Sequence, residues 1–149
     1  MEAFLKARGK NQLANEIHKI SSLARFTYVR QREPKGPGFA LLEASHLIGQ
    51  EPVAVLYGDD VVEGRVPCLK QLIRIYEKFQ KSVLALERVP KRAVSRYGII
   101  QGVRVGPRTY KITGLIEKPS LKEETSNLAI IGKYIYTQEL WAFIHQMKP

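Results

Sequence analysis

The sequence predicts an α/β fold in which a mostly parallel central sheet is flanked by helices. Patterns typical of strands and helices alternate from Phe26 to Glu87, and this order is typical of parallel strands joined by right-handed crossovers. Within that stretch the run Val53–Tyr57 is entirely apolar, as expected for a central strand buried on both faces. After Val89 the pattern changes to short runs separated by turns, which favours a β-hairpin region in the C-terminal half.

Before the central strand, the sequence predicts a helix, a strand and a second helix. Residues 10–24 carry apolar side chains at helical spacing, and Phe26–Gln31 is a short run rich in β-forming residues. Turn-forming residues follow at Arg32–Gly38, and residues 40–48 return to helical spacing, with Pro37 suited to the first turn. A glycine-rich turn that enters a helix presents unpaired backbone N–H groups, which can bind an anion or a base edge.

After the central strand, a helix is predicted first, because residues 67–80 follow the 3.6-residue period closely. Residues 82–87 and 128–136 are largely apolar and predict two further strands. Residues 95–119 form the short runs expected of hairpins. A final helix is predicted from Gln138 to Met147, with its apolar side chains facing inward.

Length and composition favour one domain, which we expect to cover residues 1–149. The chain has 149 residues, of which 44% are hydrophobic, enough for one substantial core. Cys68 is the single cysteine, so no intramolecular disulfide can form, and a small buried hydrophobe is its expected role. No stretch approaches the about 18 apolar residues of a membrane span, and no signal-peptide pattern opens the chain. We therefore expect a cytoplasmic protein with no membrane partner.

The chain is strongly basic, with 24 Lys and Arg against 14 Asp and Glu and a formal net charge of +10. This excess attracts anionic partners by electrostatic steering. The basic residues are scattered, however, and the chain contains no aromatic and basic signature of an RNA-binding module. We therefore expect small phosphorylated ligands and no nucleic acid, while general polyanion binding stays open as an alternative.

Gly58, Asp59 and Asp60 directly follow the predicted central strand. Glycine lets the backbone turn without a Cβ clash, and open α/β sheets bind ligands in the crevice outside the carboxyl ends of their strands. Hard carboxylate oxygens suit Mg²⁺, which is usually bound through one or two carboxylates together with substrate phosphates. From the pattern alone, a solvated turn or a helix cap is the alternative.

Six motifs occur in one order along the chain, and the ordered series is specific where each motif alone is weak. They are Tyr28-Val-Arg-Gln31, Glu33-Pro-Lys-Gly36-Pro-Gly38, Gly58-Asp59-Asp60, Tyr97-Gly98-Ile, Glu117-Lys118-Pro119 and Ser126-Asn-Leu-Ala-Ile-Ile-Gly132. With these motifs the chain closely resembles the bacterial UTP–glucose-1-phosphate uridylyltransferases of the sugar-nucleotidyltransferase superfamily, from Ile20 onward. The resemblance implies a partial Rossmann-like nucleotidyltransferase domain.

The resemblance also implies roles on the nucleotide side of a site. Gln31 and the backbone near Gly36 would read the uracil edge, and Gly58 would lie against the nucleotide. Asp59 would hold Mg²⁺ against the nucleotide phosphates and is one of two residues expected to act in catalysis. The alternatives are that Gln31 satisfies a strand end and that Asp60 caps the following turn.

On the sugar side, the resemblance implies that Gly98 approaches the glucose closely and that Glu117 accepts hydrogen bonds from sugar hydroxyls. Lys118 would bind the sugar and its phosphate with a compact ammonium charge, and is the second expected catalytic residue. An exposed β pair is the alternative for Glu117 and Lys118. The implied reaction is in-line attack by a glucose 1-phosphate oxygen on the α-phosphorus of UTP, which gives UDP-glucose and pyrophosphate with Mg²⁺ as cofactor.

The chain departs from the family pattern towards both ends. Family members begin with a strand and a Gly-x-Gly-Thr-Arg loop that cradles the triphosphate, and nothing before Phe26 matches it. A second metal-binding Asp would lie beyond Pro149, and Phe39 stands where relatives commonly have His. The resemblance therefore implies an internal or truncated fragment that lacks an N-terminal phosphate-binding segment and a C-terminal segment. We expect it to be inactive alone and to form a homo-oligomer. We also expect another chain or a rearranged N-terminal segment to cover the exposed edge of the central strand.

Other functions stay open from the sequence. A thymidylyl- or cytidylyl-transferring relative is the alternative enzyme, because base choice depends on a few contacts around Gln31 and Gly36. A non-catalytic module that binds nucleotides or mediates protein association is the alternative outside the enzymes.

Overall fold

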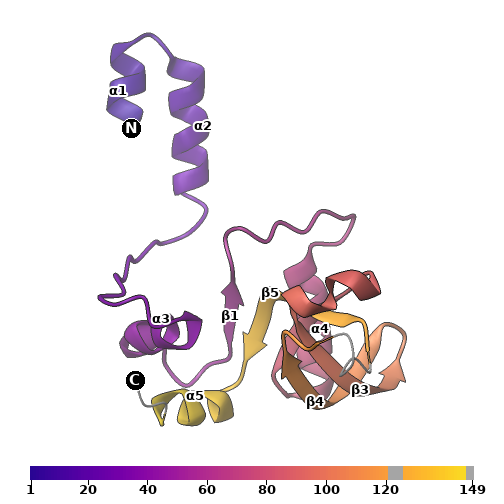
Figure 1. The fold of residues 1–149 in the computed structure, drawn as a ribbon. Coiled ribbons are helices and arrows are strands. Elements are labelled where there is room, and N and C mark those ends of the chain that lie inside the picture. The colour runs from indigo at the N-terminus through magenta and orange to yellow at the C-terminus, as the bar shows by residue number, and fades with distance from the viewer. Residues whose placement is uncertain (121–125, 147–149) are drawn as a thin grey trace. The chain divides into compact units, whose positions relative to one another are not determined.

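A computed structural model describes residues 1–120 and 126–146 of the chain. Contacts along the chain divide it into two compact units, Met1–Ala44 and Ser45–Pro149. The first unit is helical, and the second contains the sheet (Figure 1). No helix within the described ranges is long and apolar enough to cross a membrane.

The first unit begins with a helical hairpin of α1 (Glu2–Ala7) and α2 (Asn11–Ser21). The turn between them passes through Gly9, whose φ of 70° costs a glycine nothing. Ala14 of α2 is completely buried, and its small side chain suits the close contact between the two helices. The helix predicted over residues 10–24 is confirmed, at Asn11–Ser21.

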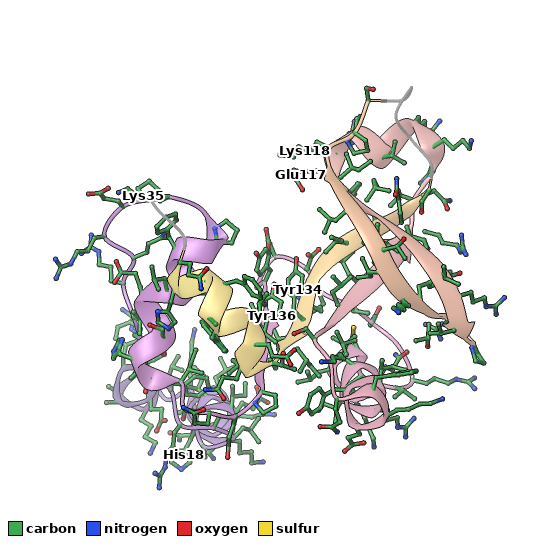
Figure 2. All side chains as sticks on the ribbon, turned by 90° about the horizontal axis from the view of Figure 1, so that it is seen from below. His18, Lys35, Glu117, Lys118, Tyr134 and Tyr136 are labelled. Atoms are coloured by element: carbon green, nitrogen blue, oxygen red, sulfur yellow. The ribbon has the colours of Figure 1, made fainter. Side chains whose placement is uncertain are left out.

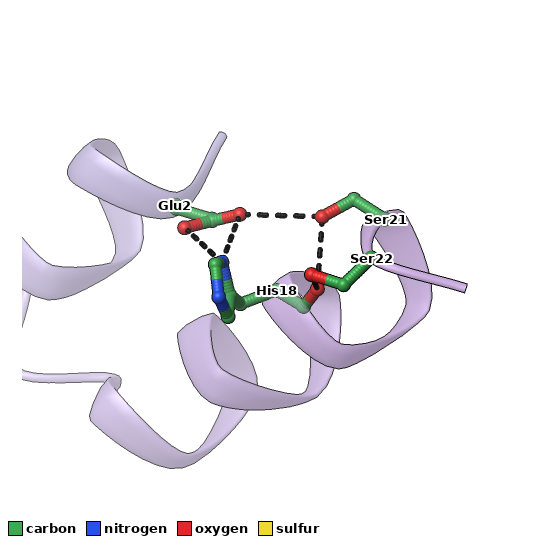
Figure 3. Close-up of polar contacts among 4 residues, drawn as sticks. All are labelled: Glu2, His18, Ser21 and Ser22. Carbon is green, nitrogen blue, oxygen red and sulfur yellow. Dashed lines mark hydrogen bonds and ion pairs between the residues drawn. The ribbon is translucent and has the colours of Figure 1, made fainter. Parts of the chain in front are cut away.

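Polar side chains join the two helices of this hairpin (Figure 3). His18 Nδ1 lies 3.3 Å from Glu2 Oε1, and Ser21 Oγ donates to the same carboxylate oxygen at 3.5 Å. Ser21 and Ser22 also donate to the His18 carbonyl, at 3.0 and 2.8 Å. The side chain of His18 is 68% exposed, so this contact lies at the surface, where ion pairs contribute little to stability.

The first unit ends with α3 (Pro37–Ala44), which begins at Pro37 as predicted. The strand predicted at Phe26–Gln31 is wrong, because this run has no regular secondary structure. A strand needs a neighbour that pairs its backbone N–H and C=O groups, and the described part of the first unit contains no other strand. Local β propensity therefore did not decide the conformation of this run.

The second unit is built on one five-stranded sheet. Its strands are β1 (Val53–Leu56), β2 (Val83–Arg88), β3 (Gly98–Gly106), β4 (Thr109–Glu117) and β5 (Leu128–Tyr136). β5 is central, because Ile135 lies opposite Ala54 of β1 on one edge and opposite Val83 of β2 on the other. β3 pairs with β5 at Ala129 and forms a long hairpin with β4 (Figure 1).

Every described strand pair is antiparallel, so the predicted mostly parallel sheet is wrong in strand direction. β1 and β2 do run in the same direction and are joined through α4 (Cys68–Phe79), as the alternating pattern predicted. β5, which comes much later in the chain, lies between them and runs in the opposite direction. The α/β class and the hairpin region are confirmed.

β1 is less buried than its apolar sequence predicts. Leu56 is 49% exposed, and Ala54 is exposed as well. Among the described strands β1 pairs only with β5, so its outer edge carries backbone groups that no described strand pairs. The prediction that β1 is buried on both faces is therefore wrong.

Two buried clusters hold helices against the sheet. Leu72 of α4 packs with Ala85 and Ile135, and Cys68 lies partly buried beside them. The second cluster contains Val89, Val94, Ile99 and Ala129, and Val94 brings the short helix η2 (Lys91–Arg96) into it. The remaining helices are η1 (Ser45–Leu47) and α5 (Gln138–His145). The predicted end of the last helix at Met147 lies outside the described residues.

Candidate functional site

The turn after β1 is tied to the middle of β5. The Tyr57 N–H donates to the Gly132 carbonyl at 2.8 Å, and the Gly132 N–H donates to Asp60 Oδ2 at 2.6 Å. Within the turn, the Asp60 N–H donates to the Tyr57 carbonyl at 3.4 Å. These bonds hold residues 57–60 against β5, and two of them involve the same glycine.

The two carboxylates of this turn have different surroundings. Asp60 is half-buried, and its Oδ2 bonds across to β5 instead of capping the following turn. Asp59 is exposed, and its carboxylate makes no hydrogen bond or ion pair with any residue that the structure describes. A carboxylate with both oxygens free at the end of a strand is available to a cation.

Close packing requires glycine at Gly132, whereas a Cβ on Gly98 would meet the far end of the exposed Glu117 side chain. A Cβ on Gly132 would lie 2.6 Å from Asp60 Oδ2, and a Cβ on Gly98 would lie 2.9 Å from Glu117 Oε2. At Gly58, by contrast, nothing lies within 4 Å of the Cβ position, and φ is not positive. The expectation that the turn needs glycine at Gly58 to avoid a Cβ clash is therefore wrong.

Three tyrosines cluster beside the turn, two of them on β5 (Figure 2). The ring centroids of Tyr57 and Tyr134 are 5.7 Å apart, and those of Tyr134 and Tyr136 are 5.2 Å apart. Burial is the main cause that raises the pKa of Tyr134 to about 12, and Tyr57, Asp60 and Glu117 raise it further. Burial also raises the pKa values of Tyr57 and Tyr136. Two carboxylates far apart in the sequence therefore act on one phenol.

Glu117 and Lys118 lie at the end of β4 (Figure 2). Gly98 is the register partner of Glu117, which places two predicted sugar-binding residues side by side. Lys118 has a φ of 48°, which is uncommon for a residue with a side chain, and its N–H donates to the Tyr97 carbonyl at 3.0 Å.

The side chains of Lys118 and Glu117 are 64% and 68% exposed, and Nζ lies 3.8 Å from Oε1. The alternative of an exposed pair therefore describes this geometry. An exposed ion pair of this kind contributes little to stability, so a ligand can replace it at low cost. Both groups remain available for binding.

The two predicted uracil-binding residues lie together in the first unit. Gln31 Nε2 donates to the Gly36 carbonyl at 3.2 Å, and the same carbonyl accepts the Ala40 N–H at 3.2 Å. Gly36 has a φ of 94° and open space at its Cβ position. Gln31 does not satisfy a strand end, because no strand forms there. It instead fixes the turn that enters α3.

The predicted site residues thus form two groups, one in each unit. The first unit holds Gln31 and Gly36, and the second holds Gly58, Asp59, Gly98, Glu117 and Lys118. Within the second unit, the turn after β1 bonds to β5 at Gly132, and β3, which pairs with the end of β4, pairs with β5 at Ala129.

The described residues contain no cluster of three or more His, Cys, Asp or Glu side chains that could hold a metal ion. Asp59 nevertheless offers one unengaged carboxylate, while one oxygen of Asp60 is occupied by the Gly132 N–H. Mg²⁺ is often held by one or two carboxylates and completed by substrate phosphates and water. The donor set of this turn fits Mg²⁺ in the company of a phosphate ligand.

Sequence reasoning missed Tyr134 and Lys133, and it did not foresee the bond between Asp60 and Gly132. Lys133 is 9% exposed, and its Nζ donates to the Tyr57 carbonyl at 2.7 Å and to the Gly132 carbonyl at 3.3 Å. A lysine within the otherwise apolar run Leu128–Tyr136 was the available signal, because a charged side chain in a buried strand needs polar partners.

Comparison with known proteins assigns this fold to a class. A family model described as "Nucleotidyl transferase" matches residues 4–149, which is nearly the whole chain. The chain belongs to this nucleotidyl transferase family.

Within the family, the similarity is to enzymes named for one reaction. The chain is 40% identical over 148 residues to a UTP–glucose-1-phosphate uridylyltransferase of Bacillus subtilis (strain 168) and to one of Staphylococcus haemolyticus (strain JCSC1435). Each alignment covers 99% of the chain and 51% of the relative. The resemblance inferred from the six motifs is confirmed.

Solved structures agree with this relationship. An apo UDP-glucose pyrophosphorylase matches with a TM-score of 0.86 and 39% identity, over 94% of the chain and 52% of that protein. A UDP-glucose pyrophosphorylase complexed with UDP-glucose matches with a TM-score of 0.85 and 38% identity, over 95% of the chain and 54% of that protein. The chain therefore spans about half the length of the relatives it matches.

The close contact at Gly132 makes a stability prediction. Gly132→Ala is expected to lower the free energy of unfolding by about 1–3 kcal/mol, because the added methyl group overlaps Asp60 Oδ2 and the Tyr57 ring. The matched control is Gly64→Ala, where the nearest heavy atom lies 3.7 Å away, and less than about 1 kcal/mol is expected. Urea unfolding followed by circular dichroism measures both, and equal stability of the two variants would contradict the contact.

The raised pKa of Tyr134 predicts a loss of stability at alkaline pH. The folded protein favours the protonated phenol, so this contribution is fully present below pH 10 and is lost as the pH rises towards 12. In an absorbance titration, Tyr134→Phe is expected to remove a phenol that ionises near pH 12. Glu117→Gln is expected to lower the pKa of that phenol. If Tyr134→Phe removes a phenol that ionises near pH 10, burial and the neighbouring charges do not raise the pKa of Tyr134.

Proposed function

We propose that this chain carries the sugar side and part of the uracil side of a uridylyltransferase site. The reaction of that site transfers a uridylyl group from UTP to glucose 1-phosphate and gives UDP-glucose and pyrophosphate. One observation carries the proposal: the turn with the free Asp59 carboxylate and the Gly98–Glu117 pair both adjoin β5 within one unit, the turn at Gly132 and Gly98 beside Ile130. The proposed setting is the cytoplasm, where UTP is available.

The sugar side is assigned to the end of β4 and the start of β3. The absence of a side chain at Gly98 leaves room for the Glu117 carboxylate, whose Oε2 would lie 2.9 Å from a Cβ at that position. Such a carboxylate accepts hydrogen bonds from vicinal hydroxyl groups, which suits a hexose. Lys118, whose backbone is held by Tyr97, would present its ammonium group to the sugar-linked phosphate.

The uracil side is assigned to the turn that enters α3. The bond from Gln31 Nε2 to the Gly36 carbonyl orients the amide group, and an amide can both donate to and accept from a base edge. The positive φ of Gly36 and the open space beside it let a planar base approach the backbone. Gly58 would lie against the nucleotide for the same steric reason, because nothing occupies the space beside its Cα.

The chemistry needs binding and orientation more than acid or base catalysis. An oxygen of glucose 1-phosphate attacks the α-phosphorus of UTP, a new P–O bond forms, and the bond to the pyrophosphate oxygen breaks. The residues of this chain hold the sugar phosphate and the base in place, which lowers the entropic cost of the encounter. Asp59 would hold Mg²⁺, which supplies positive charge to the phosphates when bound.

A ligand titration tests the assignment. UDP-glucose in the presence of Mg²⁺ is expected to bind saturably, and Asp59→Asn and Glu117→Gln are each expected to weaken binding by about tenfold or more, close to 1.4 kcal/mol. Glu87→Gln is the matched control, because Glu87 is an exposed carboxylate on β2 outside both groups of site residues. Isothermal calorimetry measures all four proteins.

Two results would contradict the proposal. If millimolar UDP-glucose does not bind, the proposed function of this chain is wrong. Binding that neither site variant weakens would show that the ligand lies elsewhere. Thymidine and cytidine diphosphate sugars in the same titration report the base preference.

We also propose that the chain forms a homo-oligomer through the outer edge of β1. Support comes from the backbone groups on that edge, which no described strand pairs, and from the 49% exposure of Leu56. Light scattering coupled to size exclusion is expected to give a mass of at least twice 17.0 kDa. Leu56→Lys is expected to shift the mass towards the monomer, and a monomer in the unsubstituted protein would overturn the proposal.

A further inference from the structure

Lys133 is the one charged side chain in the described buried core of the second unit. It lies on β5 and is 9% exposed, and no carboxylate among the described residues lies within ion-pair distance of its Nζ. Burying an ammonium group without a counter-ion costs several kcal/mol in general. A group kept in such a position needs a reason beyond packing, since an apolar side chain would fill the same space at lower cost.

The hydrogen bonds of Lys133 indicate that reason. Its Nζ donates to the Tyr57 carbonyl at 2.7 Å and to the Gly132 carbonyl at 3.3 Å. Tyr57 is the last residue before Gly58, and its N–H already donates to Gly132. The ammonium group therefore links Tyr57 to β5 a second time, beside the backbone hydrogen bond from the Tyr57 N–H to the Gly132 carbonyl.

The turn is held from both faces of the sheet. Ile135 packs under α4 with Leu72, and Lys133 projects to the same face because side chains alternate along a strand. Gly132 and Tyr134 belong to the opposite face, where Asp60 Oδ2 lies against Gly132. Lys133 hydrogen-bonds to the backbone of the turn on one face of the sheet, and Asp60 bonds the turn to Gly132 on the other face.

We propose that Lys133 is a positioning residue that fixes the Gly58–Asp60 turn so that Asp59 presents its carboxylate to a magnesium-bound nucleotide sugar. Lys133 acts through the Tyr57 carbonyl and does not touch the ligand. This inference rests on the proposed function for the identity of the ligand. The link between Lys133 and the order of the turn stands on the hydrogen bonds alone.

Three variants separate the charge, the hydrogen bonds and the volume of the side chain. Lys133→Met keeps a similar apolar stem and removes the donor, and Lys133→Arg restores a charged donor. Lys133→Gln keeps a shorter, neutral donor and serves if the methionine variant does not fold. Lys111→Met on β4 is the matched control, because it removes one positive charge from an exposed position.

Hydrogen–deuterium exchange of the ligand-free proteins tests the link to the turn. Peptides that contain residues 57–60 are expected to exchange about tenfold faster in Lys133→Met, because the Tyr57 and Gly132 bonds open more often. Lys133→Arg and Lys111→Met are expected to exchange like the unsubstituted chain, and Lys133→Gln is expected to lie between. Unchanged exchange in Lys133→Met, or in Lys133→Gln where the methionine variant is unfolded, overturns the proposal.

The affinity for UDP-glucose with and without Mg²⁺ tests the consequence for Asp59. In the unsubstituted chain Mg²⁺ is expected to strengthen binding, and in Lys133→Met this gain is expected to fall by about tenfold while the magnesium-free affinity stays within about threefold. Lys133→Arg is expected to restore the gain. A purely structural role would instead weaken both affinities together, and that result overturns the positioning role.

The two measurements distinguish the failure of this inference from the failure of the proposed function. If the unsubstituted chain binds no UDP-glucose, the proposed function is wrong. The inference that Lys133 positions Asp59 for that ligand is then wrong as well. Faster exchange in Lys133→Met would then still show that Lys133 orders the turn. If the unsubstituted chain binds with a gain from Mg²⁺ that Lys133→Met retains, the proposed function stands and the inference fails.

Discussion

Hydrogen bonds to the backbone of Gly132 hold the turn after β1, and the second group of site residues depends on them. The Gly132 carbonyl accepts a hydrogen bond from the Tyr57 N–H, and the Gly132 N–H donates to Asp60 Oδ2. Both bonds require the close approach that a glycine permits, because a Cβ would lie 2.6 Å from Asp60 Oδ2. The same turn then leaves the neighbouring Asp59 carboxylate free. One carboxylate is used for structure, and the other is available for a ligand.

The antiparallel insertion of β5 explains why segments far apart in the sequence meet. β5 pairs with β1 and β2 along its two edges and reaches β3 at Ala129. The turn after β1 is hydrogen-bonded to β5, and the end of β4 belongs to the same sheet through β3, which lies between β4 and β5. A central strand that pairs with β1, β2 and β3 therefore places the turn that carries Asp59 and the strand that pairs with Glu117 in one sheet.

The turn after β1 and the end of β4 carry acidic residues, although the chain as a whole is basic. The formal charge is +10, yet the turn and the end of β4 contribute Asp59, Asp60 and Glu117. These carboxylates lie near three tyrosines whose pKa values are raised, first of all by burial. Local negative charge in partly buried surroundings favours a cation, while the net positive charge of the chain attracts phosphates by steering. A magnesium-bound nucleotide sugar combines both charges.

Much of this protein follows from local patterns in its sequence. Helices α2, α4 and α5, the apolar strands of the second unit and the β3–β4 hairpin were predictable, because spacing and turn residues act within a few positions of the chain. The order of six loop motifs was enough to identify the family and to name Asp59, Gly98 and Glu117 as candidate residues, whose roles stay predictions. Packing in three dimensions was needed for the rest. The direction of β5, the absence of a strand at Phe26–Gln31, the bond from Gly132 to Asp60 and the burial of Lys133 depend on which segments pair, and pairing is set by contacts between distant residues that no local pattern contains.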